Sequence, residues 1–331
     1  MKPFWGSYPG VAAELDGIRG LILAAAAQGG DEVHASIRRL VESNGKMLRP
    51  AFVLLASRFG SADPGRIARL AAAIELMHMA TLVHDDLIDG AALRRGVPTL
   101  HTNLGPRTAV LAGDTLFAAC FSLIADHADA ATAGSLARLV GRMCEGEIAE
   151  TTERFLVSRS VRRYLRRTAA KTAVLFSLAF LIGGRESGGP PPVVETLRRL
   201  GWCLGMAFQI VDDILDFESS GEDVGKPVAN DLGQGVFTLP VVLALRSDDG
   251  TLARALETRR YAARGAWQAG RARRETERIG SLIRRFGGID GARAWARRYT
   301  ERARREISRL PAGESREVLA SVADRLLVRA Y

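Results

Sequence analysis

The chain has 331 residues, of which 47% are apolar, and a formal net charge of +9. Its cysteines, Cys120, Cys144 and Cys203, lie far apart without C-x-x-C spacing, which argues against a disulfide framework or a zinc site. The arginine-rich stretches alternate with Ala, Leu and Glu and carry few aromatic residues, as exposed helix faces do. The charge therefore favours anionic substrates, with no nucleic acid and at most peripheral membrane contact.

Helical periodicity runs along most of the chain. Between Ile67 and Val83 the apolar residues recur with a period near 3.6, which predicts a helix. We expect further helices over residues 11–28, 33–57, 108–127, 133–150, 160–183, 191–217, 237–246, 251–282, 288–308 and 313–329. Breakers at 60–64, 183–192 and 219–235 separate them. The pattern predicts a single all-α domain covering residues 1–331.

The expected location is the cytoplasm. The longest apolar run, residues 173–184, is too short to span a bilayer. The first residues carry no signal-peptide pattern, and the cysteine usage fits a reducing compartment.

Two helical segments carry the same acidic pattern, D-D-x-x-D. Its members are Asp85, Asp86 and Asp89 in the first segment and Asp212, Asp213 and Asp216 in the second. A helix turns by about 100° per residue, so each triplet occupies one face, beside aliphatic neighbours. Carboxylates in such surroundings need a cation. All-oxygen ligation suits Mg²⁺, which proteins hold with one or two carboxylates plus waters and substrate phosphates. The pattern therefore predicts an open Mg²⁺ site for a diphosphate, with all six aspartates as candidate ligands.

Further polar residues lie where a diphosphate site would need them. They are Lys46, Arg49, His78, Arg94, Arg95, Lys171, Thr172, Gln209 and Lys226. Lys46 and Arg49 flank an expected helix start, where backbone N–H groups favour anions. His78 precedes Asp85 by two helical turns on the same face. Each has an ordinary alternative: solvation for the cations, a satisfied core position for His78, and a backbone contact for Gln209.

Taken in order, these segments resemble the trans-isoprenyl diphosphate synthases of the polyprenyl synthetase family. The matching segments are residues 45–50 (GKMLRP), 84–89 (HDDLID), 94–96 (RRG), 113–116 (GDTL), 171–172 (KT), 209–216 (QIVDDILD) and 225–227 (GKP). The match runs from about residue 14 to the C-terminus. Residues 143–148 (MCEGEI) and 164–172 (YLRRTAAKT) are most similar to bacterial long-chain members, especially the catalytic component of heptaprenyl diphosphate synthase.

The resemblance implies an all-α bundle around a central cavity, with the two aspartate motifs on opposite walls. It implies direct Mg²⁺ ligation by Asp85, Asp89 and Asp212, assisted by Asp86, Asp213 and Asp216. The allylic diphosphate, farnesyl or geranylgeranyl, would be held by Arg94, Lys171 and Lys226, with Thr172 and Gln209 beside the reacting carbons. The diphosphate of isopentenyl diphosphate would be held by Lys46, Arg49, His78 and Arg95. The expected assembly is a homodimer, or a heterodimer with a small regulatory subunit.

The implied reaction is head-to-tail prenyl transfer with release of diphosphate. Residues 219–235, which contain Lys226, are the candidate lid over the site. A tail growing back along the first acidic helix would pass Ala80 and Thr81, then Met77 and Ile74, with one turn rising about 5.4 Å. Because Ala80 and Thr81 are small, we expect a product longer than four isoprene units, near heptaprenyl in length.

Three positions depart from the family pattern: Val236 replaces a common lysine, Glu150 a frequent glutamine, and Ala229 a usual glycine. These changes put the affinity for the allylic substrate in question, not the metal ligands. The alternatives are a class I terpene cyclase, an all-α metal phosphohydrolase of the His-Asp type, and a non-catalytic subunit of a prenyltransferase pair. The second intact D-D-x-x-D argues against all three.

Overall fold

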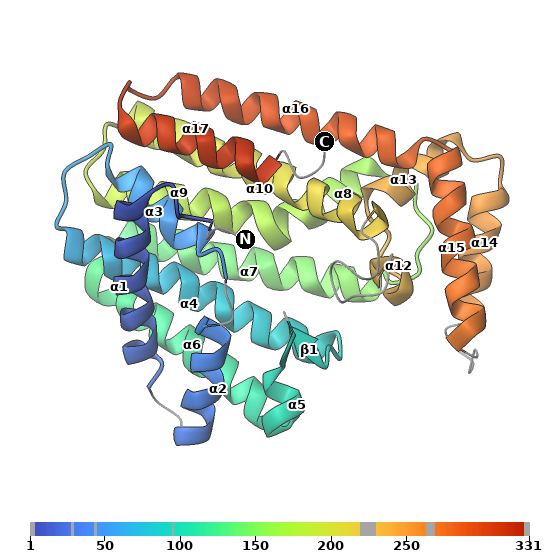
Figure 1. The fold of residues 1–331 in the computed structure, drawn as a ribbon, viewed down its shortest axis with the longest axis horizontal. Helices are drawn as coiled ribbons and strands as arrows, with labels where there is room; N and C mark the ends of the chain where they lie inside the picture. Colours follow the sequence, from blue (N-terminus) through green and yellow to red (C-terminus); the bar gives the residue numbers. More distant parts are fainter. Residues whose placement is uncertain are drawn as a thin grey trace. The chain divides into compact units, whose positions relative to one another are not determined.

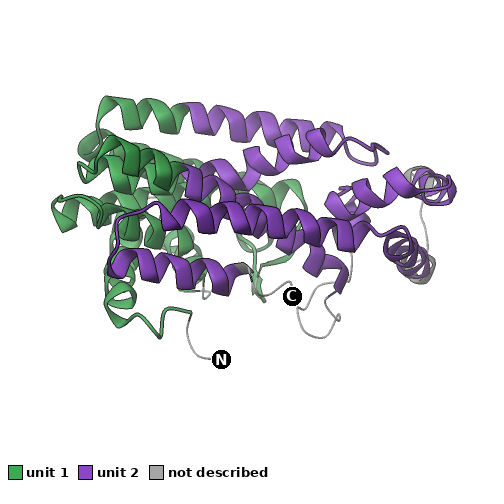
Figure 2. Cartoon of the chain, turned by 90° about the horizontal axis from the view of Figure 1, so that it is seen from above, with its two compact units in different colours: residues 1–137, 178–198 green, residues 138–177, 199–331 purple. Residues whose placement is uncertain are grey.

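The computed structural model describes residues 4–27, 30–42, 45–94, 96–218, 230–262 and 269–327. The described chain is almost entirely helical (Figure 1). It divides into two compact units, residues 1–137 with 178–198 and residues 138–177 with 199–331 (Figure 2). The expected all-α fold is confirmed; the extent of a single domain stays a prediction.

The first unit is built around one long buried helix. Its elements are α1 (Pro9–Ala25), α2 (Asp31–Glu42), α3 (Leu48–Ser57), α4 (Pro64–Ile88), β1 (Leu93–Arg94), β2 (Val97–Pro98), α5 (Leu100–Leu104) and α6 (Pro106–His127). Helix α4 packs on α1, α3 and α6. Asp63 caps its start by accepting a 2.7 Å hydrogen bond from the Arg66 N–H, and Pro64 supplies the first helical residue. This central position explains why α4 is apolar on several faces.

The second unit holds most of the remaining helices. The segments α7 (Ala130–Thr152), α9 (Val174–Glu186) and α10 (Pro191–Glu218) each belong partly to both units. The others are α8 (Val161–Thr168), the π-helical segment η1 (Ala169–Ala173), α12 (Asn230–Gln234), α13 (Leu239–Ser247), α14 (Thr251–Ala262), α15 (Ala269–Arg285), α16 (Gly288–Ser308) and α17 (Glu314–Leu327). Helix α13 packs on α16 so closely at Gly288 that a Cβ there would overlap the carbonyl of Pro240. The position therefore needs glycine.

The structure differs from the expected helices in three places. The helix expected over 33–57 is two helices, α2 and α3, and Met47 between them has a left-handed backbone with φ 48°. The helix expected over 160–183 contains the π turn η1, which carries Lys171 and Thr172. The hairpin β1–β2 was not expected because strands of two residues leave no periodic signal.

Among the helices that the structure describes, α4 and α6 are long and apolar enough to cross a membrane by length and composition alone. Most of the α4 window is buried inside its unit, as in the core helix of a soluble protein. Helix α6 buries a third of its window and exposes apolar side chains such as Leu111 and Phe121.

Candidate active site

The first acidic face lies at the end of α4. Asp86 is buried, and the side chain of Arg94 from strand β1 holds it: Nε lies 2.8 Å from both carboxylate oxygens and Nη2 lies 2.7 Å from Oδ1. This paired geometry is the strong form of a charge-assisted contact. Asp85 and Asp89 are both partly exposed. Of the three carboxylates, Asp86 is therefore neutralised by the protein, while the other two are accessible to a ligand.

Helix α6 supports this face through His84. Its Nε2 lies 3.1 Å from the Val110 carbonyl oxygen and 3.6 Å from Oδ1 of Asp114. A Cβ at Gly113 would overlap the His84 ring, so the position needs glycine. The residues 113–116 noted in the sequence thus hold the 84–89 segment in place.

Two of the residues expected to hold isopentenyl diphosphate, Lys46 and Arg49, lie around the start of α3, and His78 lies on α4. Gly45, Met47 and His78 line one small cavity together with the buried Glu75. The Trp5 indole N–H donates a 2.6 Å hydrogen bond to the carbonyl of Lys46, whose ammonium lies 5.5 Å from the Phe4 ring centroid. Arg49 is half-buried in the first turn of α3. The structure therefore brings the 45–47 segment close to His78; the binding role of these residues stays a prediction.

The residues expected to control chain length lie on α4. Ile74, Met77 and Ala80 are fully buried, whereas Thr81 is partly exposed and its hydroxyl donates a 2.8 Å hydrogen bond to the His78 carbonyl. The Cys120 thiol of α6 hydrogen-bonds to the Met77 backbone, and burial raises the pKa of this thiol to about 12. The flank of α6 beside Met77 is therefore apolar and uncharged, as a hydrocarbon tail requires.

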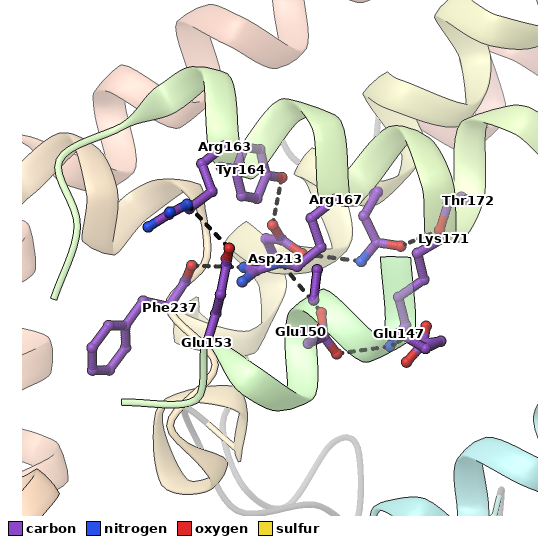
Figure 3. A network of polar contacts seen from close by, with 12 residues as sticks. Glu147, Glu150, Glu153, Arg163, Tyr164, Arg167, Lys171, Thr172, Asp213 and Phe237 are labelled. Carbon is purple, nitrogen blue, oxygen red and sulfur yellow. Dashed lines mark hydrogen bonds and ion pairs between the residues drawn. The ribbon is translucent and has the colours of Figure 1, made fainter. Parts of the chain in front are cut away.

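The second acidic face lies on α10 and centres on a buried carboxylate (Figure 3). Asp213 accepts a 2.6 Å hydrogen bond from the Tyr164 hydroxyl at Oδ2 and a 3.0 Å bond from the Gln209 amide at Oδ1. Gln209 in turn accepts a 2.7 Å hydrogen bond from the Thr172 hydroxyl. Asp212, in contrast, is exposed. Thr172, Gln209 and Asp213 are thus joined in one chain, which fixes the direction of the Gln209 amide.

Several acidic side chains lie close together at this face. Burial raises the pKa of Asp213 to about 7, although hydrogen bonds from Gln209 and Tyr164 oppose the shift. Burial, reinforced by Asp216, Asp213 and Asp212, raises the pKa of Asp231 to about 8. The Asp231 N–H lies 3.3 Å from Oδ2 of Asp216. A cation beside these carboxylates would favour their charged form and lower their pKa.

A basic residue lies beside these carboxylates. Lys171 Nζ lies 3.0 Å from Oε1 of Glu150 and 3.3 Å from Oε1 of Glu147 (Figure 3). The other oxygen of Glu150 lies 3.3 Å from Nε of Arg167, whose guanidinium donates a 2.8 Å hydrogen bond to the Phe237 carbonyl. Glu150, noted above as a departure from glutamine, therefore binds two cations at once.

Sequence reasoning did not single out Tyr164, Arg167 or Asp231. Tyr164 and Arg167 precede Lys171 by seven and four residues, so helical spacing from Lys171 could have indicated the face that they share. Asp231 follows the second motif by fifteen residues, beyond any helical spacing. Its contact with Asp216 depends on tertiary packing, which no sequence pattern specifies.

The carboxylates fit a hard divalent cation. Among the residues that the structure describes, no three His, Cys, Asp or Glu side chains converge into a closed metal shell. Mg²⁺ does not require one, because waters and substrate phosphates complete its coordination. The exposed Asp212 and the raised pKa of its neighbours Asp213 and Asp231 match such an open site.

Several expected site residues lie outside the described residues. They are Arg95, Lys226, Ala229 and the part of the candidate lid from 219 to 229. Val236 is described: it is nearly buried, and its N–H donates a 2.9 Å hydrogen bond to the Asp231 carbonyl. Its side chain adds no charge to the site.

The sequence of the chain matches a known family and curated relatives. The family model described as polyprenyl synthetase matches residues 31–268. The "heptaprenyl diphosphate synthase component 2" of Geobacillus stearothermophilus is 39% identical over 284 residues, which cover 86% of each chain.

Solved structures agree over nearly the whole chain. A decaprenyl diphosphate synthase from Rhodobacter capsulatus aligns with a TM-score of 0.89 at 31% identity, covering 99% of this chain and 100% of the other. A polyprenyl synthase from Caulobacter crescentus, "complexed with calcium and isoprenyl diphosphate", aligns with a TM-score of 0.85 at 32% identity, covering 97% and 95%.

Proposed function

We propose substrates and a product for this chain, which belongs to the polyprenyl synthetase family of trans-prenyl diphosphate synthases. The proposed reaction condenses isopentenyl diphosphate head-to-tail with an allylic diphosphate such as farnesyl or geranylgeranyl diphosphate. It yields a long-chain all-trans polyprenyl diphosphate of about heptaprenyl length. A heptaprenyl relative and a decaprenyl structural neighbour both support a long product, and their names differ in its length.

The observation that carries this proposal is the acidic face of α10 with a lysine beside it. The pKa of Asp213 is raised to about 7 and that of Asp231 to about 8, and a nearby cation would favour the charged form of both carboxylates. Lys171 adds a positive charge on the neighbouring π turn. Adjacent carboxylates and a lysine suit a diphosphate with its bound cation, and the Caulobacter crescentus neighbour is described with both calcium and isoprenyl diphosphate.

The chain's residues have distinct proposed roles. Asp85, Asp89 and Asp212 would hold Mg²⁺, which when bound supplies electrostatic stabilisation of the departing diphosphate. Lys171 would bind the same diphosphate as the allylic C–O bond ionises. Asp86, Asp213 and Asp216 would assist these ligands; Asp86 is oriented by Arg94, and Asp213 by Tyr164 and Gln209. Arg94 would also help to hold the allylic diphosphate.

The remaining steps follow from the substrates. The double bond of isopentenyl diphosphate attacks the allylic cation, a C–C bond forms, and one proton leaves the new cation. We assign that proton to the released diphosphate, because no side chain of the described acidic faces is needed as a base. His78, Lys46 and Arg49 would hold isopentenyl diphosphate, and Lys226 and Arg95 would contribute further charge.

Product analysis tests the proposal directly. The full chain is incubated with farnesyl diphosphate, labelled isopentenyl diphosphate and Mg²⁺, and the dephosphorylated products are separated by length. A linear polyprenol, absent when EDTA replaces Mg²⁺, is the expected result. A cyclised hydrocarbon would support a terpene cyclase, free phosphate would support a phosphohydrolase, and no product would support a non-catalytic subunit.

A matched pair of variants tests the metal assignment. Asp212→Asn should reduce kcat by about a hundredfold or more, because it removes a proposed ligand of the Mg²⁺ that would stabilise the departing diphosphate. Asp290→Asn removes an exposed carboxylate in the first turn of α16, whose one ion pair among the described residues is with Arg293, and it should leave kcat unchanged. Equal activity of the two variants would refute the role of Asp212.

We also propose a cytoplasmic protein that assembles as a homodimer or with a small regulatory subunit. The Geobacillus stearothermophilus relative carries "component 2" in its name, which suggests a partner for that protein. Measuring product length with and without a co-expressed partner subunit distinguishes the two assemblies.

A further inference from the structure

The second unit contains a cavity of about 740 Å³ that the reaction proposed above does not use. Helices α7, α8, α10 and α16 contribute its walls. Met206 and Tyr299 are buried and form its base together with the half-buried Trp202. None of the residues predicted to bind Mg²⁺ or either diphosphate lines it. Its volume falls within the range of small-molecule sites, about 300–1,000 Å³.

Three arginines lie at the opening of this cavity. Arg142 on α7 and Arg162 and Arg166 on α8 all line it and are exposed. None of the three side chains makes a hydrogen bond, an ion pair or a ring contact with any residue that the structure describes. We name Arg142, Arg162 and Arg166 the arginine rim.

The other arginines of α8 behave differently. Arg163 pairs with Glu153 at 3.1 Å, and Arg167 pairs with Glu150 at 3.3 Å. Arg162 and Arg166 are spaced i and i+4, so their like charges repel each other on the helix surface. The lining contains five arginines and two glutamates, so Glu145, which also lacks a partner among the described residues, does not cancel the positive charge.

We propose that this cavity binds an amphiphile with a phosphate head and a hydrocarbon tail. Guanidinium groups bind phosphate through paired N–H donors, and the arginine rim supplies three of them without partners. The base of Trp202, Met206 and Tyr299 offers apolar surface that a tail would remove from water. A free anion would use only the rim, and an uncharged hydrocarbon only the base. This inference does not depend on the proposed reaction.

Calorimetry with dodecyl phosphate, below its micelle concentration and in EDTA, tests the site without the Mg²⁺-dependent reaction. Wild-type protein should bind dodecyl phosphate at least about tenfold more tightly than butyl phosphate, because the shorter tail covers less of the apolar base. The triple variant Arg142→Gln, Arg162→Gln, Arg166→Gln should bind dodecyl phosphate about tenfold more weakly.

A matched control separates the cavity from overall charge. The triple variant Arg38→Gln, Arg107→Gln, Arg246→Gln removes three exposed arginines that also lack partners among the described residues but do not line the cavity. It should bind as wild type does. Equal binding by the two triple variants, equal binding of butyl and dodecyl phosphate, or no binding by wild type would each overturn the proposal. The tail-length comparison needs no variant and stands even if one fails to fold.

Sedimentation with vesicles distinguishes the source of the ligand. Wild-type protein is mixed with phosphatidylcholine vesicles that contain phosphatidylglycerol. Sedimentation that the rim variant loses and the control keeps assigns the site to a lipid headgroup. Binding of dodecyl phosphate without sedimentation assigns it to a free phosphate amphiphile. Both results support the cavity as a site for this chemistry.

Discussion

The Tyr164 hydroxyl donates a 2.6 Å hydrogen bond to Oδ2 of Asp213. The bond joins α8 to α10 in the interior of the second unit, where Asp213 is almost fully buried. Since the Gln209 amide occupies the other oxygen, Asp213 has both oxygens engaged by the protein. Asp213 therefore orients the acidic face, and its neighbour Asp212, the proposed metal ligand, is exposed.

Removing the Tyr164 hydroxyl should weaken the positioning of Asp213 without leaving a cavity in the core. Tyr164→Phe keeps the ring and deletes one hydrogen bond to a charged acceptor, which is worth about 1.5–3 kcal/mol. We expect kcat to fall by about tenfold and the Mg²⁺ concentration for half-activation to rise. Tyr8→Phe, at a hydroxyl with no hydrogen bond among the described residues, is the matched control and should change neither value. An unchanged Mg²⁺ requirement in Tyr164→Phe would show that Asp213 does not position the site.

Glu150 should weaken allylic substrate binding because it competes for Lys171. Its carboxylate lies 3.0 Å from the ammonium, and the substrate must displace or share that contact. Glu150→Gln removes the negative charge and restores the residue frequent in the family. We expect the KM for farnesyl diphosphate to fall about two- to fivefold, in line with about 0.5–1 kcal/mol for a partly exposed ion pair. Initial-rate kinetics at saturating isopentenyl diphosphate measure this.

The control for Glu150 is a carboxylate on the same helix that does not contact Lys171. Glu145→Gln, one and a half turns earlier on α7, should leave the KM unchanged. A KM that rises in Glu150→Gln would instead mean that the ion pair holds Lys171 in its binding position.

The pair of Arg94 and Asp86 should stabilise the end of α4. Arg94→Gln leaves a buried carboxylate without its bidentate partner, at a cost of about 1–3 kcal/mol after allowance for the partial exposure of Arg94. We expect a lower midpoint in urea unfolding. The double variant Asp86→Asn, Arg94→Gln should recover most of that loss, because no buried charge is left unpaired. If the double variant is less stable than Arg94→Gln alone, the pair is not the stabilising element.

The acidic motifs and the all-α fold could be predicted because their signals are local. Asp85 and Asp89 follow from helical spacing within one segment, and their partial exposure at the end of α4 agrees with a ligand-facing position. The partners of these residues could not be predicted in the same way. Tyr164 and Asp213 are 49 positions apart, and Arg66 reaches Glu186 across 120 positions. Such contacts depend on tertiary packing, which periodicity does not encode.

Backbone irregularities escaped prediction for a related reason. The left-handed Met47 that divides α2 from α3 is a non-glycine residue in a region that few side chains adopt. Its neighbours Lys46 and Arg49 lie near the start of α3, as the sequence predicts, whereas the single helix predicted over 33–57 is wrong. The π turn at Ala169–Ala173 has ordinary helix-forming residues, so only the structure reveals that Lys171 and Thr172 lie in it.

Asp231 should make the metal-free protein less stable as the pH rises. Its pKa is raised to about 8, so between about pH 4 and pH 8 the folded state holds a proton that the unfolded state has released. Stability therefore falls with pH in this window, by up to about 1.4 kcal/mol per pH unit. Asp231→Asn cannot titrate and should lose this part of the slope. Urea unfolding in EDTA at several pH values compares the two, and identical slopes would contradict the raised pKa.

Thr81 provides the sharpest test of product length. It is partly exposed beside the fully buried Ala80, one turn before Asp85, so a phenylalanine there would project into the path expected for the tail. Thr81→Phe should shorten the main product by several isoprene units, since each unit occupies about one helical turn of 5.4 Å. Thr81→Val has nearly the same size and loses only the hydrogen bond to the His78 carbonyl, so it should keep the wild-type length. Products from farnesyl diphosphate are separated by chain length after dephosphorylation. A wild-type distribution from Thr81→Phe would place the tail elsewhere, whereas shortening in both variants would assign the effect to the lost hydrogen bond.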